Sequence, residues 1–134
     1  MPLLLDSSLW IDFTRSRSPA ELKRFIAPFI LDPQTRLAEP VRFELLRSAR
    51  PTEIPLLQAQ FATIPCLGTP EDVWSSATLL GQGCQRIGRR VTSIDLVVAA
   101  VALHHKATVV TFDSDFEAIA NVSELKVQRL QRPT

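Results

Sequence analysis

The sequence predicts an α/β domain in three layers, in which a short and mainly parallel β-sheet is flanked by helices. Two apolar runs, residues 2–5 and 108–112, each stop at an acidic residue, which is typical of buried central strands. Helical segments separate these runs, and strands that alternate with helices form parallel sheets. The 134 residues suffice for one hydrophobic core, so we expect a single domain over residues 1–134.

The first third of the chain opens with the strand at residues 2–5. Residues 6–8 then offer side-chain oxygens that cap a short helix. Residues 20–30 carry apolar side chains at helical spacing and predict an amphipathic helix. Pro28 inside it lacks a backbone N–H, so we expect this helix to end or kink there. Residues 34–38 are predicted to form a second short strand or an extended link.

The middle of the chain is predicted to be mostly helical. Pro40 and Pro51 each suit the first turn of a helix, because proline needs no hydrogen-bond acceptor there. Residues 64–67 form at most a short extended piece. Pro70 starts a helix that runs to about Gly88. Two glycines weaken this helix unless a neighbour packs closely against them, Gly81 and Gly83.

The last third contains the most apolar helix of the chain. Thr92 and Ser93 cap it, and residues 94–105 form it, so we expect it to be buried on most sides. Residues 108–112 are rich in β-branched side chains and predict a central strand. A short helix starting at Asp113 and an edge-like strand at residues 125–130 follow. Residues 131–134 are expected to be a loose tail.

The composition favours a cytoplasmic globular protein. The net charge is +1, so any nucleic-acid contact needs locally placed basic residues. No apolar run approaches the roughly 20 residues of a membrane span. The first residues meet an acid at once and lack a charged leader region, which is unlike a signal peptide. Cys66 and Cys84 lack zinc spacing, and we interpret each as a buried thiol in a reducing compartment.

Four carboxylates lie in apolar surroundings. Asp6 and Asp113 follow the two predicted central strands, and ligand sites of parallel sheets form at such strand ends. Asp95 lies in the first turn of the buried helix, and Glu44 lies on a helix with an inward apolar face. Gathered acids raise one another's pKa, so a site that brings them together is a cation site. All-oxygen ligands favour Mg²⁺ or Mn²⁺ over zinc.

Each acid also has a structural explanation when it is taken alone. Asp6 and Asp113 suit helix caps, and Asp95 suits the positive end of a helix dipole. Glu44 alone is a solvated helix residue. Their joint placement favours the shared cation site.

Four sequence blocks together resemble the PIN-domain toxins of the VapC type. The blocks lie in the order of that family and span nearly the whole chain: Leu4-Leu5-Asp6-Ser7-Ser8-Leu9-Trp10-Ile11-Asp12, Pro40-Val41-Arg42-Phe43-Glu44-Leu45-Leu46, Ser93-Ile94-Asp95-Leu96-Val97-Val98-Ala99-Ala100-Val101-Ala102 and Thr108-Val109-Val110-Thr111-Phe112-Asp113-Ser114-Asp115-Phe116. The chain departs from the family at residues 48–50, where glycine is common, and this leaves the end of the Glu44 helix open.

The resemblance implies a PIN-like fold and a divalent-metal-dependent endoribonuclease, the toxin of a toxin–antitoxin pair. Its substrate would be tRNA or ribosomal RNA, and an antitoxin protein would cover the acidic site. The acids carried over by position are Asp6, Glu44, Asp95 and Asp113. Asp115 is a fifth metal ligand or a helix cap. Ser8 and Thr111 match the hydroxyls that support the site.

Further expectations concern surfaces. Four arginines close to the acidic blocks or to helix starts are candidates for RNA phosphate contacts, or alternatively form a solvated rim: Arg15, Arg42, Arg89 and Arg90. The family resemblance implies a homodimer, and the apolar faces of residues 20–29 and 54–61 are candidates for its contact. Trp10, Trp74 and the phenylalanines are expected in the core, away from RNA.

Other function classes fit less well. A receiver domain needs a lysine after a late strand, and Asp113 follows that strand instead. An aspartyl phosphatase needs an aspartate where Ser8 stands. A nucleotide-binding Rossmann domain needs a glycine-rich phosphate loop after a strand, and the glycines of this chain do not form one. The remaining alternative is a catalytically inactive PIN-like module that binds RNA or a protein.

Overall fold

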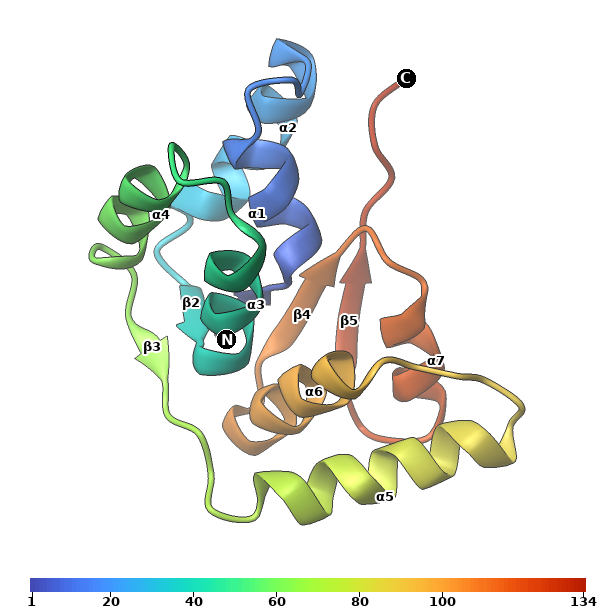
Figure 1. The fold of residues 1–134 in the computed structure, drawn as a ribbon. Helices are drawn as coiled ribbons and strands as arrows, with labels where there is room; N and C mark the ends of the chain where they lie inside the picture. The colour runs from blue at the N-terminus through green and yellow to red at the C-terminus, as the bar shows by residue number, and fades with distance from the viewer.

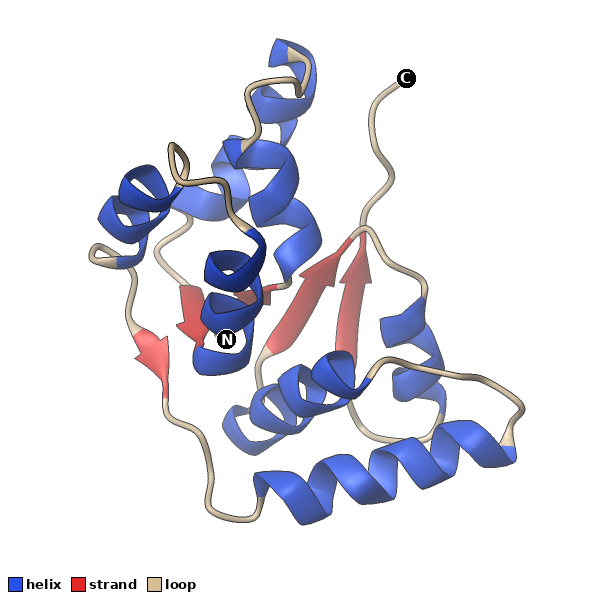
Figure 2. Ribbon diagram, in the orientation of Figure 1, coloured by secondary structure: helices blue, strands red, loops and turns tan.

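Five parallel strands form one sheet in the order β3-β2-β1-β4-β5 in the computed structural model, which describes residues 1–134. Seven helices flank the sheet (Figures 1 and 2). In chain order the elements are β1 (Leu3–Leu5), α1 (Ser7–Thr14), α2 (Ala20–Leu31), β2 (Thr35–Ala38), α3 (Glu39–Ser48), α4 (Ile54–Phe61), β3 (Cys66–Leu67), α5 (Val73–Arg86), α6 (Ser93–His105), β4 (Thr108–Thr111), α7 (Asp115–Asn121) and β5 (Lys126–Arg129). The predicted α/β class is confirmed, and the sheet is wholly parallel.

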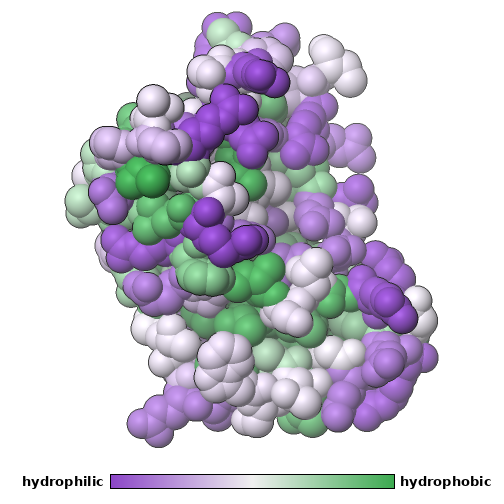
Figure 3. Space-filling view, viewed as in Figure 1, coloured by the Kyte–Doolittle hydropathy of each residue, from purple (hydrophilic) through white to green (hydrophobic).

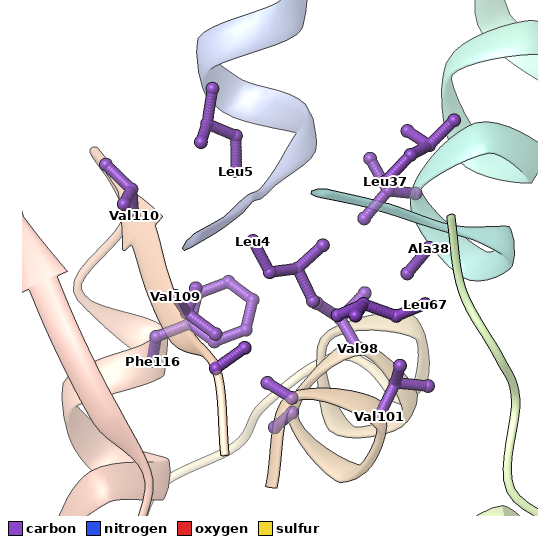
Figure 4. Close-up of a cluster of buried hydrophobic side chains, with 14 of the residues drawn as sticks. Leu4, Leu5, Leu37, Ala38, Leu67, Val98, Val101, Val109, Val110 and Phe116 are labelled. Carbon is purple, nitrogen blue, oxygen red and sulfur yellow. The ribbon is translucent and has the colours of Figure 1, made fainter. Parts of the chain in front are cut away.

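Helices cover both faces of the sheet. Figure 1 shows α1, α2 and α4 gathered on one side and α5, α6 and α7 on the other. Successive side chains of a strand point to opposite faces. Accordingly, Leu5 points towards α1, whereas Leu4 points towards Val98 and Val101 of α6 (Figure 4). All four of these side chains are fully or almost fully buried, so the core continues through the sheet.

The strand order reverses beside β1, which is where ligand sites of parallel sheets form. The chain moves from β1 outwards to β2 and β3, and then returns to the other side of β1 with β4 and β5. Such a reversal leaves a crevice between the two strands where the order switches, at their carboxyl ends. Here the two strands are β1 and β4, with Leu5 opposite Val110. Asp6 and Asp113 follow these strands.

Close helix packing accounts for the glycines of α5. A Cβ added at Gly81 would lie 3.0 Å from Cδ1 of Leu96 on α6. A Cβ added at Gly83 would lie 3.2 Å from Cβ of Val122, which follows α7. The two glycines therefore let α5 approach its neighbours. This is the close packing that was expected to offset their weakening of the helix.

The structure corrects the expectation that α2 ends at Pro28. Helix α2 continues through Pro28 to Leu31, because Ile26 and Ile30 on either side of the proline are buried and hold the helix to the core. Beyond β5, the backbone N–H of Leu130 donates to the carbonyl of Thr111 at 2.8 Å, and Arg132 contacts α1.

The structure also corrects two burial expectations. Cys84 is buried as predicted, but Cys66 is exposed because β3 is a two-residue strand at the edge of the sheet. Trp10 is fully buried, whereas Trp74 is 71% exposed. Helix α5 buries the face that carries Val73 and Ala77, and Trp74 lies about 100° around the helix from Val73.

Exposed apolar side chains gather where three helices meet. Phe43, 59% exposed, and Trp74 line a groove of about 540 Å³ between α3, α5 and α6. Its apolar lining is completed by Pro40, Val73, Ile94 and Val97. Figure 3 shows apolar residues on this face, where α3 and α6 lie. No helix of the structure combines the length and the hydropathy that crossing a lipid bilayer requires.

Candidate active site

Asp6 is the most buried carboxylate of the molecule, with 4% of its surface exposed. Its backbone N–H donates to the carbonyl of Val110 at 3.1 Å, which continues the pairing of β1 with β4. Its side chain then caps α1, because Oδ1 accepts from the N–H of Ser8 at 3.1 Å. Asp6 is thus a helix cap, and the cap also fixes its carboxylate at the carboxyl end of β1.

Two hydroxyls hold the Asp6 carboxylate and link it to the end of β4. Ser8 Oγ donates to Oδ1 at 2.5 Å, and Thr111 Oγ1 donates to Oδ2 at 2.7 Å. The same Thr111 oxygen accepts from the N–H of Asp113 at 2.8 Å. Ser8 Oγ accepts from the N–H of Phe112 at 3.2 Å. The two residues predicted to support the site therefore connect the turn after β1 to the turn after β4.

Three further aspartates lie together beside this link. Asp95, in the first turn of α6, Asp113, after β4, and Asp115, at the start of α7, are half-buried. Each offers one carboxylate oxygen, and the three oxygens lie within 4.8 Å of one another. Oδ1 of Asp113 also accepts from the N–H of Asp115, the first residue of α7, at 2.9 Å. Asp115 does not cap that helix itself.

The fourth predicted acid, Glu44, is half-buried on α3. It lies near enough to Asp95 for its charge to raise the pKa of that carboxyl, as the charges of Asp6 and Asp113 also do. The other three predicted acids therefore lie within electrostatic reach of Asp95. Asp6 and Glu44 stand outside the tight group of three carboxylate oxygens.

Burial and mutual repulsion make the charged forms of two acids costly. Burial raises the pKa of Asp6 to about 6, although hydrogen bonds from Ser8 and Thr111 partly lower it. Burial also raises the pKa of Asp95 to about 7, ahead of the repulsion by its acidic neighbours. Near neutral pH the site therefore carries carboxylates that a cation would stabilise.

The donor set fits a hard divalent cation. Every side chain of the cluster offers oxygen, and no histidine or cysteine belongs to it. Asp6 keeps a carboxylate in a buried place where only neutral hydroxyls and a backbone N–H bind it. Oxygen ligands that carry net negative charge are the ligands Mg²⁺ and Mn²⁺ prefer.

The predicted RNA-contact arginines divide into two kinds. Arg15 and Arg90 are exposed and make no ion pair. Nη2 of Arg89 lies 3.6 Å from Asp115, so this arginine already neutralises part of the acidic cluster. Nη1 of Arg42 lies 3.7 Å from Glu39. The spacing of Glu39 and Arg42, three residues apart on one helix, is compatible with their ion pair, whereas the pair of Arg89 and Asp115 joins distant segments.

The chain resembles known proteins over most of its length. The profile of the PIN domain family matches residues 3–122. The protein named Ribonuclease VapC11 of Mycobacterium tuberculosis (strain ATCC 25618 / H37Rv) is 28% identical over 132 residues, which covers 92% of this chain and 96% of that protein.

Solved structures share the fold. The VapBC2 structure of Rickettsia felis, bound to a promoter DNA fragment, has a TM-score of 0.76 at 13% identity, covering 98% of this chain and 100% of that chain. VapC20 of Mycobacterium tuberculosis, described as a sarcin–ricin loop cleaving toxin, has a TM-score of 0.67 at 19% identity, covering 92% and 98%. The predicted PIN-like fold is confirmed. With the profile match over residues 3–122, these findings establish that the chain belongs to the PIN domain family.

Proposed function

We propose that the protein is a divalent-metal-dependent endoribonuclease that acts as the toxin of a toxin–antitoxin pair. The observation that carries the proposal is the gathering of Asp95, Asp113 and Asp115 near the buried Asp6, beyond the carboxyl ends of β1 and β4. A cluster of this kind suits the hydrolysis of a phosphodiester. The similarity to Ribonuclease VapC11 over 92% of the chain supports RNA as the substrate.

In this proposal Asp6, Asp95 and Asp113 would hold Mg²⁺ or Mn²⁺, and Glu44 and Asp115 would complete the ligand set. When bound, the cation supplies charge neutralisation at the phosphate and a lower pKa for water. Ser8 and Thr111 orient the Asp6 carboxylate through their hydrogen bonds, so its two oxygens keep fixed directions.

Hydrolysis also requires proton transfers. The attacking water loses a proton, and the ribose oxygen that leaves phosphorus gains one. Glu44 is half-buried and is the one predicted acid outside both the aspartate triplet and the hydrogen-bonded Asp6. We assign it the acceptance of the proton from the attacking water or a place among the ligands.

The partners follow from the same proposal. VapC20, a structural relative, is described as cleaving the sarcin–ricin loop, which favours structured RNA of the ribosome or tRNA as the substrate class. Related structures such as VapBC-1 of Haemophilus influenzae contain VapB and VapC together. We infer that an antitoxin protein likewise covers the acidic site of this chain.

We also infer a homodimer, but at a different surface from the one expected from the sequence. Ile26 of α2 and both Leu57 and Phe61 of α4 are buried inside the molecule, which leaves Leu56, 51% exposed, as the exposed large apolar side chain of the predicted surface. The groove between α3, α5 and α6 carries both a hollow and the projecting Trp74. One surface with both features suits the self-complementary contact of a twofold dimer.

The proposal is tested by incubating the purified protein with total RNA in Mn²⁺ and in EDTA, and by sequencing the cleaved ends. We expect discrete cuts in tRNA or ribosomal RNA that need the metal. The alternative, an inactive PIN-like module, predicts RNA or protein binding without cuts at any metal concentration. That outcome would replace the nuclease proposal.

A further inference from the structure

The segment after β5 crosses the end of β4 beside the acidic site. Arg129 is paired with Thr111, and the N–H of Leu130 then donates to the Thr111 carbonyl at 2.8 Å. Arg132 follows two residues later and reaches α1, a contact between positions 120 residues apart in the chain. The start of the tail is therefore fixed to the two segments that carry Asp6 and Asp113.

Two contacts fix the guanidinium of Arg132. Nε donates to Oδ2 of Asp12 at 2.7 Å, and Cζ lies 4.4 Å from the centre of the Phe112 ring. Phe112 is itself held, because it is 7% exposed and its ring lies 6.4 Å from that of Phe25. An ion pair at one edge and an aromatic ring below leave the guanidinium little freedom to rotate.

Arg132 differs from the other ion-paired arginines in the nitrogen it uses. Arg42, Arg89 and Arg129 each contact their acid through a terminal Nη nitrogen. Arg132 contacts Asp12 through Nε, and neither of its Nη groups makes a hydrogen bond within the chain. Its side chain is 52% exposed, so the fixed Nη edge can receive an anion. Two parallel N–H donors are the arrangement that binds a phosphate at two oxygens.

The position of Arg132 relates it to the acidic site. Phe112 directly precedes Asp113, and its N–H is bound by Ser8, which also donates to Asp6. Asp12 lies six residues beyond Asp6, which is about 9 Å along α1. Both anchors of Arg132 are thus tied to the acids proposed to cut RNA. An RNA strand with one phosphate among those acids would carry neighbouring phosphates past this edge.

We propose that Arg132 binds a backbone phosphate of the RNA next to the one that is cut. This rests on the proposed nuclease function. Asp12 offsets part of the guanidinium charge, so the contact works through directed hydrogen bonds as well as through charge. Arg132 is a substrate-positioning residue with no part in the chemical step.

Binding of a fluorescein-labelled oligouridine in EDTA, measured by fluorescence anisotropy over a salt series, tests the proposal. Phosphate contacts are independent of sequence, so a homopolymer suffices. Arg132→Ala should raise Kd by about tenfold and reduce the slope of log K against log salt by about 0.7, the loss of one contact to a single strand. Arg132→Lys should restore part of the slope. Arg129→Ala removes an arginine paired through Nη and should match the wild type.

Two further readouts separate binding from a structural role. Cleavage of total RNA by Arg132→Ala should show a raised KM with kcat retained, and its Mn²⁺ affinity by calorimetry should equal that of the wild type. An unchanged salt slope overturns the proposal, including when stability or Mn²⁺ affinity falls. If the wild type cuts RNA and Arg132→Ala binds like Arg129→Ala, only the Arg132 proposal fails. A wild type that neither cuts nor binds RNA contradicts both proposals.

Discussion

Some acids of the site both bind the backbone at the start of a helix and belong to the acidic cluster. For this reason the sequence alone was compatible with helix caps and with metal ligands. Asp6 caps α1 and Asp113 accepts from the first N–H of α7, yet the charges of both also act on Asp95. The cap interpretation and the ligand interpretation were therefore not exclusive. The sequence indicated the acids, but the pairing of Arg89 with Asp115 and of Arg132 with Asp12 depends on contacts between distant segments. No local pattern encodes these contacts.

Thr111 offers a residue-scale test because it serves two acids at once. Thr111→Val keeps the shape but removes the donor to Asp6 and the acceptor for the N–H of Asp113. We expect the free energy of unfolding to fall by about 1–3 kcal/mol and Mn²⁺ affinity to fall by roughly 10-fold or more. Thr108→Val, on the same strand without a side-chain hydrogen bond, is the control. Equal effects of the two substitutions in denaturant titration and calorimetry would count against this role of Thr111.

The raised pKa values predict how stability depends on pH. Asp6 titrates near 3.8 when unfolded and at about 6 when folded, and Asp95 at about 7 when folded. Between these values the folded state binds more protons, so the metal-free protein should lose stability as pH rises from 4 to about 7. For the well-buried Asp6 the loss is on the order of 3 kcal/mol.

Urea unfolding in EDTA at pH 5 and pH 8 measures this dependence. Asp6→Asn is the control, because it removes one of the two titrating groups and should reduce the difference between the two pH values to the part that Asp95 contributes. Mn²⁺ should stabilise the wild type more at pH 8 than at pH 5, since protons compete for the same oxygens. If the metal-free wild type gains stability from pH 5 to pH 8 relative to Asp6→Asn, the pKa of Asp6 is not raised in the folded protein.

At the scale of elements, apolar periodicity predicted the strands and helices that contain long regular patterns. The strand β4 and the buried helix α6 lie where expected. The sequence failed where tertiary packing outweighs local preference. Pro28 does not end α2, because the buried residues beyond it hold the helix in place. The strand β3 has two residues, and it exists only because β2 offers a free edge.

The packing of α5 is tested by two alanine substitutions that have opposite expected signs. Alanine favours a helix over glycine by about 1 kcal/mol. At Gly81 the neighbour is the flexible end of Leu96, which can move, so Gly81→Ala should be neutral or stabilising. At Gly83 the neighbour is the branched Cβ of Val122, so Gly83→Ala should destabilise by about 1–3 kcal/mol.

Thermal unfolding of the two variants measures both effects. Adding Val122→Ala to Gly83→Ala should recover part of the loss, because it removes the branch that the new methyl group meets. Equal stability of the Gly81 and Gly83 variants would show that α5 does not approach α7 as described.

At the scale of the whole molecule, exposed aromatic residues predict self-association. The protein should have twice the mass of the 15.0 kDa chain in light scattering. Trp74→Glu should convert it to a monomer, because a charge would be buried in the apolar groove between α3, α5 and α6. Leu79→Glu, at an exposed position of the same helix, should leave the dimer intact. A dimer that survives Trp74→Glu would place the contact elsewhere.

The fold and the acidic residues together support the proposed nuclease function. The strand order reverses at β1 and β4, and the acids that follow these strands lie near Asp95, as do Glu44 and Asp115. Sequence blocks and strand ends predicted this gathering, since the carboxyl ends of parallel strands share one edge. The choice of RNA rather than another phosphodiester came from family resemblance, because the acids themselves do not read the polymer.

Cleavage of total RNA in Mn²⁺ by the wild type, Asp6→Asn and Asp72→Asn tests whether the acidic cluster cuts RNA. Asp72 is an exposed acid outside the cluster, so its variant should cut like the wild type. Asp6→Asn should cut about 100-fold more slowly or worse while its circular dichroism spectrum stays native. A folded Asp6→Asn protein that cuts RNA as fast as the wild type would contradict the proposed role of the acidic cluster.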